Sequence, residues 1–211
     1  MTSPPLSIQS RPVLQDGFFR PDGEVVVRRG DLPHWRQDGA LYFVTFRLSD
    51  SLPGELLDRW RRQRDRWLEL HPNPTPCQLE DFVRMYRGRI EQWLDRGVGS
   101  CALGEEGAKK IVEGALRHFD GERYELGKFA VAGNHVHSTL RTLPGVDLTD
   151  VLQSWKGFTS WRIGRLPGFK ARHPELCGCL WQHESFDHIV RSESDLERIH
   201  RYIENHEGKR E

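Results

Sequence analysis

Residues 124–143, with the sequence YELGKFAVAGNHVHSTLRTL, contain the pattern that decides the fold. Strand-forming residues cover positions 124–132 and 135–143, and Gly133-Asn134 separates the two runs. Two strands joined by so short a connection form an antiparallel hairpin. We therefore expect a β-hairpin here, with the other elements of the domain arranged around it.

The second strand of this hairpin carries two histidines, His135 and His137, with Val136 between them. Side chains alternate between the two faces of a strand, so both imidazoles point to one face and Val136 points to the other. Two neutral imidazoles at this spacing can bind a divalent metal ion. The alternative is a pair of half-buried histidines without a ligand, and the spacing does not decide between the two.

Other segments supply the partners of the hairpin. Residues 40–48, ALYFVTFRL, are nearly continuous in β-branched and aromatic side chains, as a central strand is. The spacing of apolar residues predicts a helix at about 105–119 and a second helix, capped by Asp147 or Thr149, after the hairpin. One more strand near residues 178–182 would complete the order.

The order strand, helix, strand, strand, helix, strand is the split βαβ plan. We therefore expect an α+β fold, a ferredoxin-like antiparallel sheet with helices on one face and the other face open to carry a site. Apolar periodicity at about residues 53–97 predicts a two-helix insertion, and a capping box at Ser194 predicts a C-terminal helix. We expect one domain of residues 25–211 after a flexible arm of residues 1–24.

Composition limits what the chain can be. Its 211 residues include 31 basic and 31 acidic ones, so the net charge is zero and any nucleic-acid contact needs a local excess of positive charge. No apolar run is long enough to span a bilayer, and residues 1–12 lack the apolar centre of a signal peptide. A cytoplasmic location without a membrane partner is expected. The four cysteines fit no common zinc spacing and predict free thiols.

Positive charge is concentrated between residues 156 and 173, which include five basic residues, no acidic residue and several aromatic ones. Such a mixture suits single-stranded nucleic acid, because phosphates pair with Lys and Arg while bases stack on rings. The alternative is a basic helix end whose aromatic side chains pack inward. The candidate DNA-binding residues are Trp155, Lys156, Arg162, Arg165, Lys170 and Arg172.

A third histidine follows in residues 180–191, LWQHESFDHIVR. We expect His188 to complete a metal-binding set with His135 and His137. If residues 185–191 are helical, Ser185 and His188 share one face at a spacing of three, and the hydroxyl of Ser185 lies beside the metal.

Several short motifs occur along the chain in a characteristic order. They are Leu32-Pro33-His34-Trp35, Tyr42-Phe43-Val44-Thr45-Phe46, Arg117-His118-Phe119-Asp120-Gly121, Asn134-His135-Val136-His137, Leu143-Pro144-Gly145, Ser154-Trp155-Lys156-Gly157-Phe158-Thr159, Leu180-Trp181-Gln182, Phe186-Asp187-His188-Ile189-Val190-Arg191 and Arg201-Tyr202-Ile203-Glu204-Asn205. Over residues 30–205 the chain thus resembles the REP-associated tyrosine transposases, which are insertion-sequence-type single-tyrosine transposases of the HUH single-strand nuclease superfamily.

The resemblance implies a function. It implies that His135 and His137 bind Mg²⁺ or Mn²⁺, which polarises a phosphodiester of single-stranded DNA. It also implies a nucleophilic tyrosine on the C-terminal helix that forms a 5′-phosphotyrosine link, so that strands are cleaved and rejoined in DNA transposition. The implied substrates are hairpin-forming, palindromic REP-like repeats. A homodimer is compatible with the sequence, which does not determine the oligomeric state.

The sequence departs from the family at two places. Ala132-Gly133 stands where the family usually has Met-Pro, a change in the turn that leaves the histidines in place. The family's tyrosine position, four residues after Trp181, holds Ser185, which is therefore the candidate catalytic residue. Its hydroxyl is shorter by a ring, and a serine alkoxide is far more basic than a phenolate, whose pKa is about 10. Tyr202 matches a tyrosine that packs the helix in the family.

Two functions of different classes follow from this substitution. The chain is either a transposase or single-strand DNA endonuclease with a replaced nucleophile, or a catalytically inactive DNA-hairpin-binding protein derived from one. A third alternative is a two-histidine phosphoesterase, because His137-Ser138-Thr139 and His183-Glu184-Ser185 share the pattern His-x-Ser/Thr. That alternative requires both motifs on paired strands that face one cleft.

Overall fold

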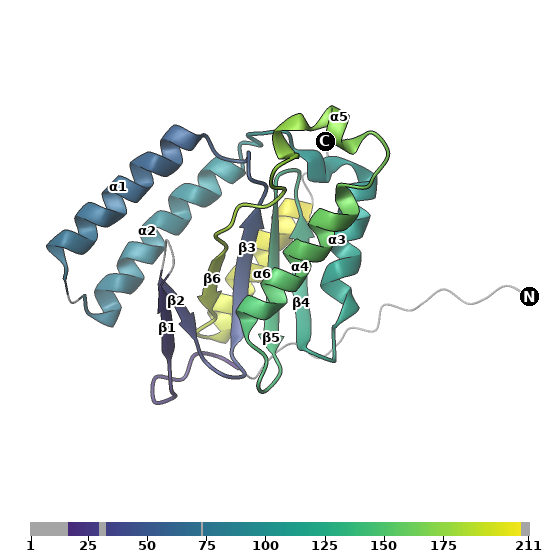
Figure 1. Ribbon diagram of the computed structural model, residues 1–211. Helices are drawn as coiled ribbons and strands as arrows, with labels where there is room; N and C mark the ends of the chain where they lie inside the picture. Colours follow the sequence, from purple (N-terminus) through teal and green to yellow (C-terminus); the bar gives the residue numbers. More distant parts are fainter. Residues whose placement is uncertain (1–16, 30–32, 73, 208–211) are drawn as a thin grey trace, which may run out of the picture.

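The structure, a computed structural model, describes residues 17–29, 33–72 and 74–207. At its centre lies a four-stranded antiparallel sheet with the strand order β4-β5-β3-β6 (Figure 1). The strands are β3 (Leu41–Arg47), β4 (Tyr124–Val131), β5 (His135–Thr142) and β6 (Phe186–Ile189). The predicted hairpin is thus β4 and β5, and the strongest predicted strand is the central β3.

Two helices follow the order expected of a split βαβ plan. The helix α3 (Glu106–His118) lies between β3 and β4 in the chain, and α4 (Leu148–Ile163) lies between β5 and β6. Asp147 caps α4, since its side chain accepts a hydrogen bond of 2.7 Å from the backbone N–H of Thr149. The expected α+β, ferredoxin-like fold is confirmed.

The sheet has a core on each face because β3 is buried along its whole length. Tyr42, Val44 and Phe46 pack into a cluster with apolar residues of α3 and α4. Leu41 and Phe43, which point to the other face, pack into a separate cluster. The alternation of a strand therefore divides the domain into two layers of side chains.

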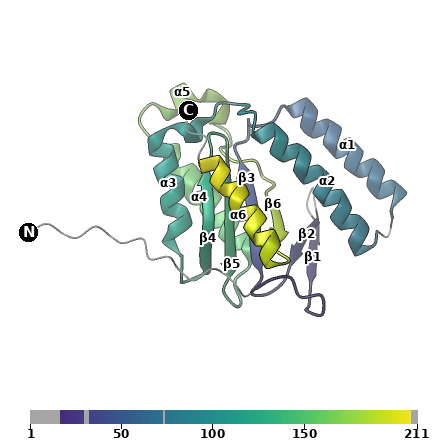
Figure 2. The same cartoon turned by 180° about the vertical axis from the view of Figure 1, so that it is seen from behind.

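The second face is covered by the C-terminal helix α6 (Glu193–Glu207), as Figure 2 shows. Leu196, Ile199 and Ile203 of α6 pack against Leu41 and Phe43. The sequence predicted the helix but left this face open, and that expectation was wrong. The physical reason is the apolar stripe of α6, whose residues three and four positions apart need a buried surface.

Two long helices lie beside the β6 edge of the sheet (Figure 1): α1 (Gly54–Leu70) and α2 (Pro76–Leu94). They fall within the residues predicted as an insertion. Thr75 and Gln78 form a capping box that begins α2. Leu56, Trp60 and Phe82 form a small core with Phe186 of β6, so the pair of helices has its own apolar contacts and is anchored on the edge strand.

The last strand differs from its prediction. Residues 178–182 contain only an isolated bridge between Trp181 and Leu48, and residues 186–189 form β6 rather than part of a helix. The pairing of Phe43 with His188 and of Thr45 with Phe186 fixes its register. The open edge of β3 decides this assignment, because it offers backbone partners that a local pattern does not reveal.

Shorter elements complete the described chain: β1 (Val26–Arg29), β2 (Pro33–Arg36), η1 (Ala102–Gly104), α5 (Phe169–Arg172) and η2 (Pro174–Leu176). Residues 1–16 of the predicted arm lie outside the described residues, and the backbone of Gly17 and Phe19 is bonded to Leu41 and Val190. Among the described helices none is long and apolar enough to cross a membrane. The thiols of Cys101, Cys177 and Cys179 are free, as expected.

Candidate functional site

Three histidines meet on the α6 face of the sheet. His135 and His137 of β5 point to this face, as the strand alternation predicts, and His206 approaches them from the last turn of α6. One possible ligand atom from each ring lies within 4.8 Å of the others. His135 and His137 are 1% and 0% exposed, so the pair is shielded from water. We call these residues the histidine cluster.

Neighbouring oxygens hold the two strand histidines in place. Nδ1 of His135 donates to Oδ1 of Asn134 at 2.7 Å. Nδ1 of His137 lies 2.8 Å from the hydroxyl of Thr45, which is its partner across β3 and β5. Metal-binding histidines are commonly oriented in this way through their second nitrogen. Nε2 of each ring is then the atom that can bind a metal ion.

His206 is held from two sides. Its Nδ1 lies 2.9 Å from the carbonyl oxygen of Tyr202, one turn earlier in α6. Its Nε2 lies 2.7 Å from a carboxylate oxygen of Asp95, the residue that follows α2. The sequence analysis missed both His206 and Asp95. The available signal was the spacing of four between Tyr202 and His206, which puts both side chains on one face of a helix.

Tyr202 lies directly beside the histidine cluster. The centre of its ring is 5.0 Å from that of His137 and 4.5 Å from that of His206. Phe43 contacts the same tyrosine edge-on, with ring centres 6.2 Å apart. The site therefore combines three imidazoles and a phenol, in which the tyrosine and the third histidine come from the C-terminal helix.

The structure does not bring His188 to the cluster. His188 lies on β6, and its Nε2 is 3.0 Å from a carboxylate oxygen of Asp195 in the first turn of α6. Burial opposes ionisation of Asp195, but the hydrogen bond with His188 outweighs it and holds the pKa of that carboxyl below its usual range. The histidine from the C-terminal region that joins His135 and His137 is thus His206.

Ser185, predicted as the catalytic residue, does not reach the histidines either. It precedes β6, and β3 separates that edge strand from β5. Two strand spacings amount to about 10 Å. The structure therefore places Tyr202, and not Ser185, beside the histidine cluster. The phosphoesterase alternative fails for the same reason, since residues 183–185 and the strand of His137 are not paired.

A cavity of about 1180 Å³ leads to the histidine cluster. Its walls include His135, His206 and Asn134, together with charged side chains from α3 and the end of α2. Pockets for small molecules usually measure about 300–1,000 Å³. This cavity is thus larger than a typical small-molecule pocket, and His135 and His206 lie in its wall.

The predicted DNA-binding residues separate into two groups. Trp155 is only 2% exposed and donates from its indole N–H to the hydroxyl of Tyr124 at 2.9 Å. It is a core residue, which corrects its assignment as a base-stacking side chain. Lys156 donates to the carbonyl oxygens of Gln182 and His183, and its burial, with the nearby charge of Arg47, lowers its pKa to about 8. Both side chains form hydrogen bonds within the protein.

The other predicted DNA-binding residues lie on the surface. Arg172 forms two hydrogen bonds with Glu105, at 2.8 and 2.7 Å, whereas Arg162, Arg165 and Lys170 are exposed. The guanidinium of Arg165 lies 4.3 Å from the ring centre of Trp161. We define the α4 surface as Phe158, Trp161, Arg162 and Arg165, whose two aromatic rings are about half exposed.

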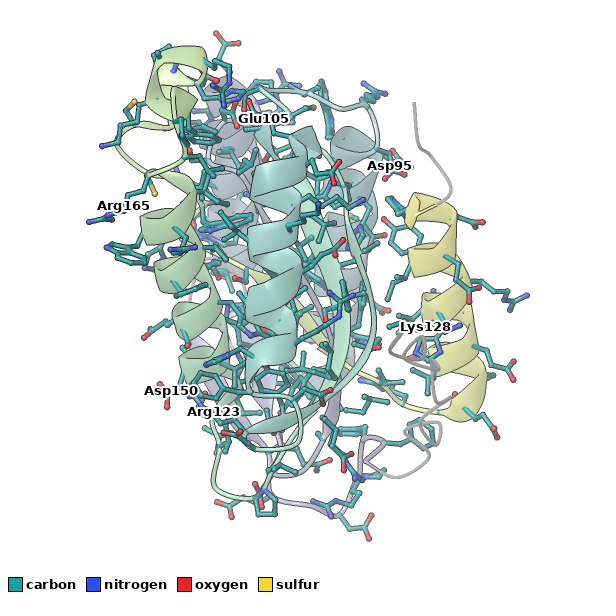
Figure 3. The ribbon with its side chains drawn as sticks, turned by 90° about the vertical axis from the view of Figure 1, so that its right-hand side faces the viewer. Asp95, Glu105, Arg123, Lys128, Asp150 and Arg165 are labelled. Atoms are coloured by element: carbon teal, nitrogen blue, oxygen red, sulfur yellow. The ribbon has the colours of Figure 1, made fainter. Side chains whose placement is uncertain are left out.

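The α4 surface and the histidine cluster lie on opposite sides of the molecule. Figure 3 shows Arg165 pointing outward from α4, while Asp95 lies at the other side, beside the end of α6. The sheet stands between the two helices. A strand of nucleic acid bound along α4 alone would therefore not touch the histidines.

A second polar network contains His34 of β2. Its two ring nitrogens lie 2.6 Å from Asp187 and 2.6 Å from Glu184. Arg36 donates to both carboxylate oxygens of Asp187, at 2.7 and 3.0 Å. Burial lowers the pKa of His34, but its hydrogen bonds with Asp187 and Glu184 prevail and raise it to about 9. We call these four residues the His34 network, which ties β2 to β6.

Comparison with solved structures finds eight matching chains, including the following two. The first is described as the REP-associated tyrosine transposase bound to a REP hairpin, with 14% identity and a TM-score of 0.38. That match covers 79% of this chain but only 65% of the other, so this chain spans less than two thirds of its length. The second is described as a candidate transposase from Deinococcus radiodurans R1, with 19% identity, a TM-score of 0.38 and coverage of 79% and 89%.

No curated protein sequence matches the chain. Residues 103–206, from η1 to His206, match the profile of the family described as Transposase IS200 like. This region includes β5 and α6, which carry all members of the histidine cluster and Tyr202. Over residues 103–206 the chain is therefore similar to the IS200-like transposase family.

Proposed function

We propose that the protein is a metal-dependent transposase that cleaves and rejoins single-stranded DNA, with Tyr202 as its nucleophile. The observation that carries the proposal is the position of Tyr202 on the C-terminal helix, with its ring 5.0 Å from His137 and 4.5 Å from His206. The family resemblance implies a nucleophilic tyrosine on that helix. Tyr202, rather than Ser185, meets this requirement.

The donor set of the histidine cluster fits a divalent cation. Three imidazoles converge, and the two strand histidines are oriented through Nδ1 by Asn134 and Thr45. Mg²⁺ prefers oxygen ligands, whereas imidazole is a ligand for transition metals. Of the two ions that the resemblance implies, Mn²⁺ is the better match. When bound, it would supply Lewis-acid polarisation of the scissile phosphate.

Tyr202 supplies the covalent chemistry in this proposal. Its phenolic oxygen forms a bond to phosphorus and loses its proton to solvent, while the bond from phosphorus to the 3′ oxygen breaks and that oxygen takes a proton from solvent. The products are a free 3′-hydroxyl and a 5′-phosphotyrosine, whose bond energy is available for rejoining. A phenolate with a pKa of about 10 is far easier to form than a serine alkoxide. The difficulty of activating a serine hydroxyl, which argued against cleavage by Ser185, does not apply to Tyr202.

We propose single-stranded DNA, and within it hairpin-forming REP-like palindromes, as the substrate. The family match supports DNA as the partner, and the ordered motifs of the chain support the narrower class. The cavity beside His135 and His206 has room for part of a strand. The α4 surface, with exposed Arg162 and Arg165 around Trp161, offers stacking and phosphate contacts for another part of the same molecule.

The deciding experiment compares wild type, Tyr202→Phe and Ser185→Ala on a labelled DNA hairpin with a single-stranded flank. We expect wild type and Ser185→Ala to form a denaturation-resistant protein–DNA adduct in Mn²⁺, and no adduct with EDTA. Tyr202→Phe should form none, because it lacks the attacking oxygen. An adduct that persists in Tyr202→Phe and disappears in Ser185→Ala would overturn the assignment.

The second candidate function is a DNA-hairpin-binding protein without cleavage activity. The separation of the α4 surface from the histidine cluster favours it, because DNA could bind there without engaging the site (Figure 3). Tight hairpin binding by the wild type without any adduct, in Mn²⁺ and in Mg²⁺, would select this function over the first.

A further inference from the structure

The two-helix insertion is connected to the histidine cluster at one point. Apolar residues of α1 and α2 form one cluster with Phe186, and the two helices stand beside the sheet (Figure 1). Residues 94–97, at the end of α2 and just after it, line the histidine cavity. This part of the chain contacts His206, a member of the histidine cluster, and Asn134, the partner of His135.

The first contact is between Asp95 and His206. The carboxylate oxygen lies 2.7 Å from Nε2 of the ring, and the side chains are 33% and 6% exposed. Asp95 follows the last residue of α2, where a negative charge is unfavourable for the helix dipole. Helix stability thus gives no reason for an acid at this position, and its contact with the histidine does.

The second contact runs through Asn134. Its side-chain amide nitrogen donates to the carbonyl oxygens of Val98 at 2.8 Å and Leu94 at 3.4 Å. The oxygen of the same amide accepts from Nδ1 of His135. Because both ends of the amide are bonded, the end of the insertion also fixes the orientation of His135.

We propose that residues 94–98 of the insertion form the supporting wall of the metal site, with Asp95 as a positioning residue that acts through His206. The inference rests on the proposed metal-binding function. A carboxylate bonded to Nε2 of His206 fixes the ring and makes Nδ1 a better donor, so a bound metal ion would take Nδ1 in place of the carbonyl oxygen of Tyr202. Removal of such partners typically weakens metal binding by about 10- to 100-fold.

The test measures Mn²⁺ affinity of the full chain by calorimetry for wild type, Asp95→Asn and Asp95→Glu. We expect Asp95→Asn to weaken Mn²⁺ binding by about 10-fold or more, since the amide keeps the shape but loses the charge. Asp95→Glu should recover part of the affinity, because it restores the carboxylate. The thermal midpoint in EDTA should be equal to that of wild type or slightly higher in Asp95→Asn, from the helix dipole.

The matched control is Glu113→Gln, which removes a negative charge from the wall of the same cavity. Glu113 pairs with Arg117 and does not belong to the cluster. Its Mn²⁺ affinity should stay within twofold of wild type. An equal loss in Glu113→Gln and Asp95→Asn would overturn the proposal, because the effect would then be general electrostatics of the cavity.

A double-mutant cycle with His206→Ala shows whether Asp95 acts through His206. We expect Asp95→Asn to have no further effect on Mn²⁺ affinity when His206 is absent. The same fold-change in both backgrounds would refute the positioning role. The two failures can be distinguished. If the proposed metal-binding function is wrong, wild type binds no Mn²⁺. If only the role of Asp95 is wrong, wild type binds Mn²⁺ and Asp95→Asn binds it equally well.

Discussion

Two groups of residues in this molecule hold histidines in opposite surroundings: the His34 network contains one histidine, and the histidine cluster contains three. In the His34 network both ring nitrogens of His34 lie 2.6 Å from carboxylates, and Arg36 neutralises Asp187 from its other side. In the histidine cluster, three rings lie with their centres 4.5 to 5.5 Å apart, and the carboxylate of Asp95 contacts His206. The first group satisfies its own charges, while the second converges on a point where a cation would bind.

The difference teaches that burial of a histidine does not by itself identify its role. His34 is surrounded by acceptors and stabilises the junction of β2 and β6. His135 and His137 have their Nδ1 atoms held by a neutral amide and a hydroxyl. Neither partner carries a charge, and neutral imidazole is the form that binds metal. The chemistry of the neighbours therefore separates a structural histidine from a candidate ligand.

The largest expected effect comes from His137→Gln. Loss of one of three imidazole ligands should weaken Mn²⁺ binding by about 100-fold or more and remove the DNA adduct. The free energy of unfolding in EDTA should change much less, because the amide keeps a bond to Thr45. Calorimetry and urea unfolding measure the two quantities. Unchanged Mn²⁺ affinity would show that the histidine cluster is structural and does not differ in role from the His34 network.

His34→Gln should show the opposite pattern. It leaves the buried Asp187 with Arg36 alone, and loss of a partner from a buried charged network costs roughly 3 kcal/mol of unfolding free energy. Urea unfolding at pH 6 measures the loss, and Mn²⁺ affinity should stay within twofold of wild type. A protein with wild-type stability and impaired Mn²⁺ binding would reverse the roles of the two groups.

The pH dependence of stability sharpens the same contrast. The pKa of His34 is about 9 in the folded protein against its ordinary value of 6.5, so its contribution is fully present below pH 6.5. As pH rises from 6.5 through 9 the folded state loses this proton and the contribution disappears. The difference in stability between wild type and His34→Gln should shrink by about 3 kcal/mol between pH 6 and pH 9.5. A difference that is constant over this range would contradict the proposed ion-pair network.

The smallest effect is expected on the α4 surface, which touches neither histidine group. Arg165→Ala removes a cation that stacks on Trp161 at 4.3 Å, so hairpin DNA should bind about 3- to 10-fold more weakly at low salt. Mn²⁺ affinity and the pH profile of stability should both match wild type. The matched control is Arg117→Ala, an arginine paired with Glu113 on α3. An equal loss of DNA binding in both variants would mean that only net charge matters.

Local pattern was sufficient for a large part of the fold. The runs at residues 124–132 and 135–143 predict β4 and β5, and alternation places His135 and His137 on one face. Helical periodicity predicts α3, α4 and the two helices beside the sheet. These features depend on neighbours close in sequence, so the chain itself specifies them.

Local sequence patterns did not predict the contacts between segments that are distant in the chain. The strand β6 forms at residues 186–189 because the open edge of β3 accepts it, and this removes Ser185 and His188 from the histidines. Trp155 is a core residue because α4 turns it toward Tyr124 rather than toward solvent. In each case a motif was recognised, but the direction of its side chain depended on an element far away in the chain.

The sequence by itself determined the ferredoxin-like plan and the two strand histidines, since both follow from periods of 2 and 3.6 residues. Only the tertiary structure decided which residues meet them. The stripe of Leu196, Ile199 and Ile203 must be buried, so α6 lies across the open face of the sheet. That single packing contact carries Tyr202 and His206 to the histidine pair, and no local pattern encodes where a helix will dock.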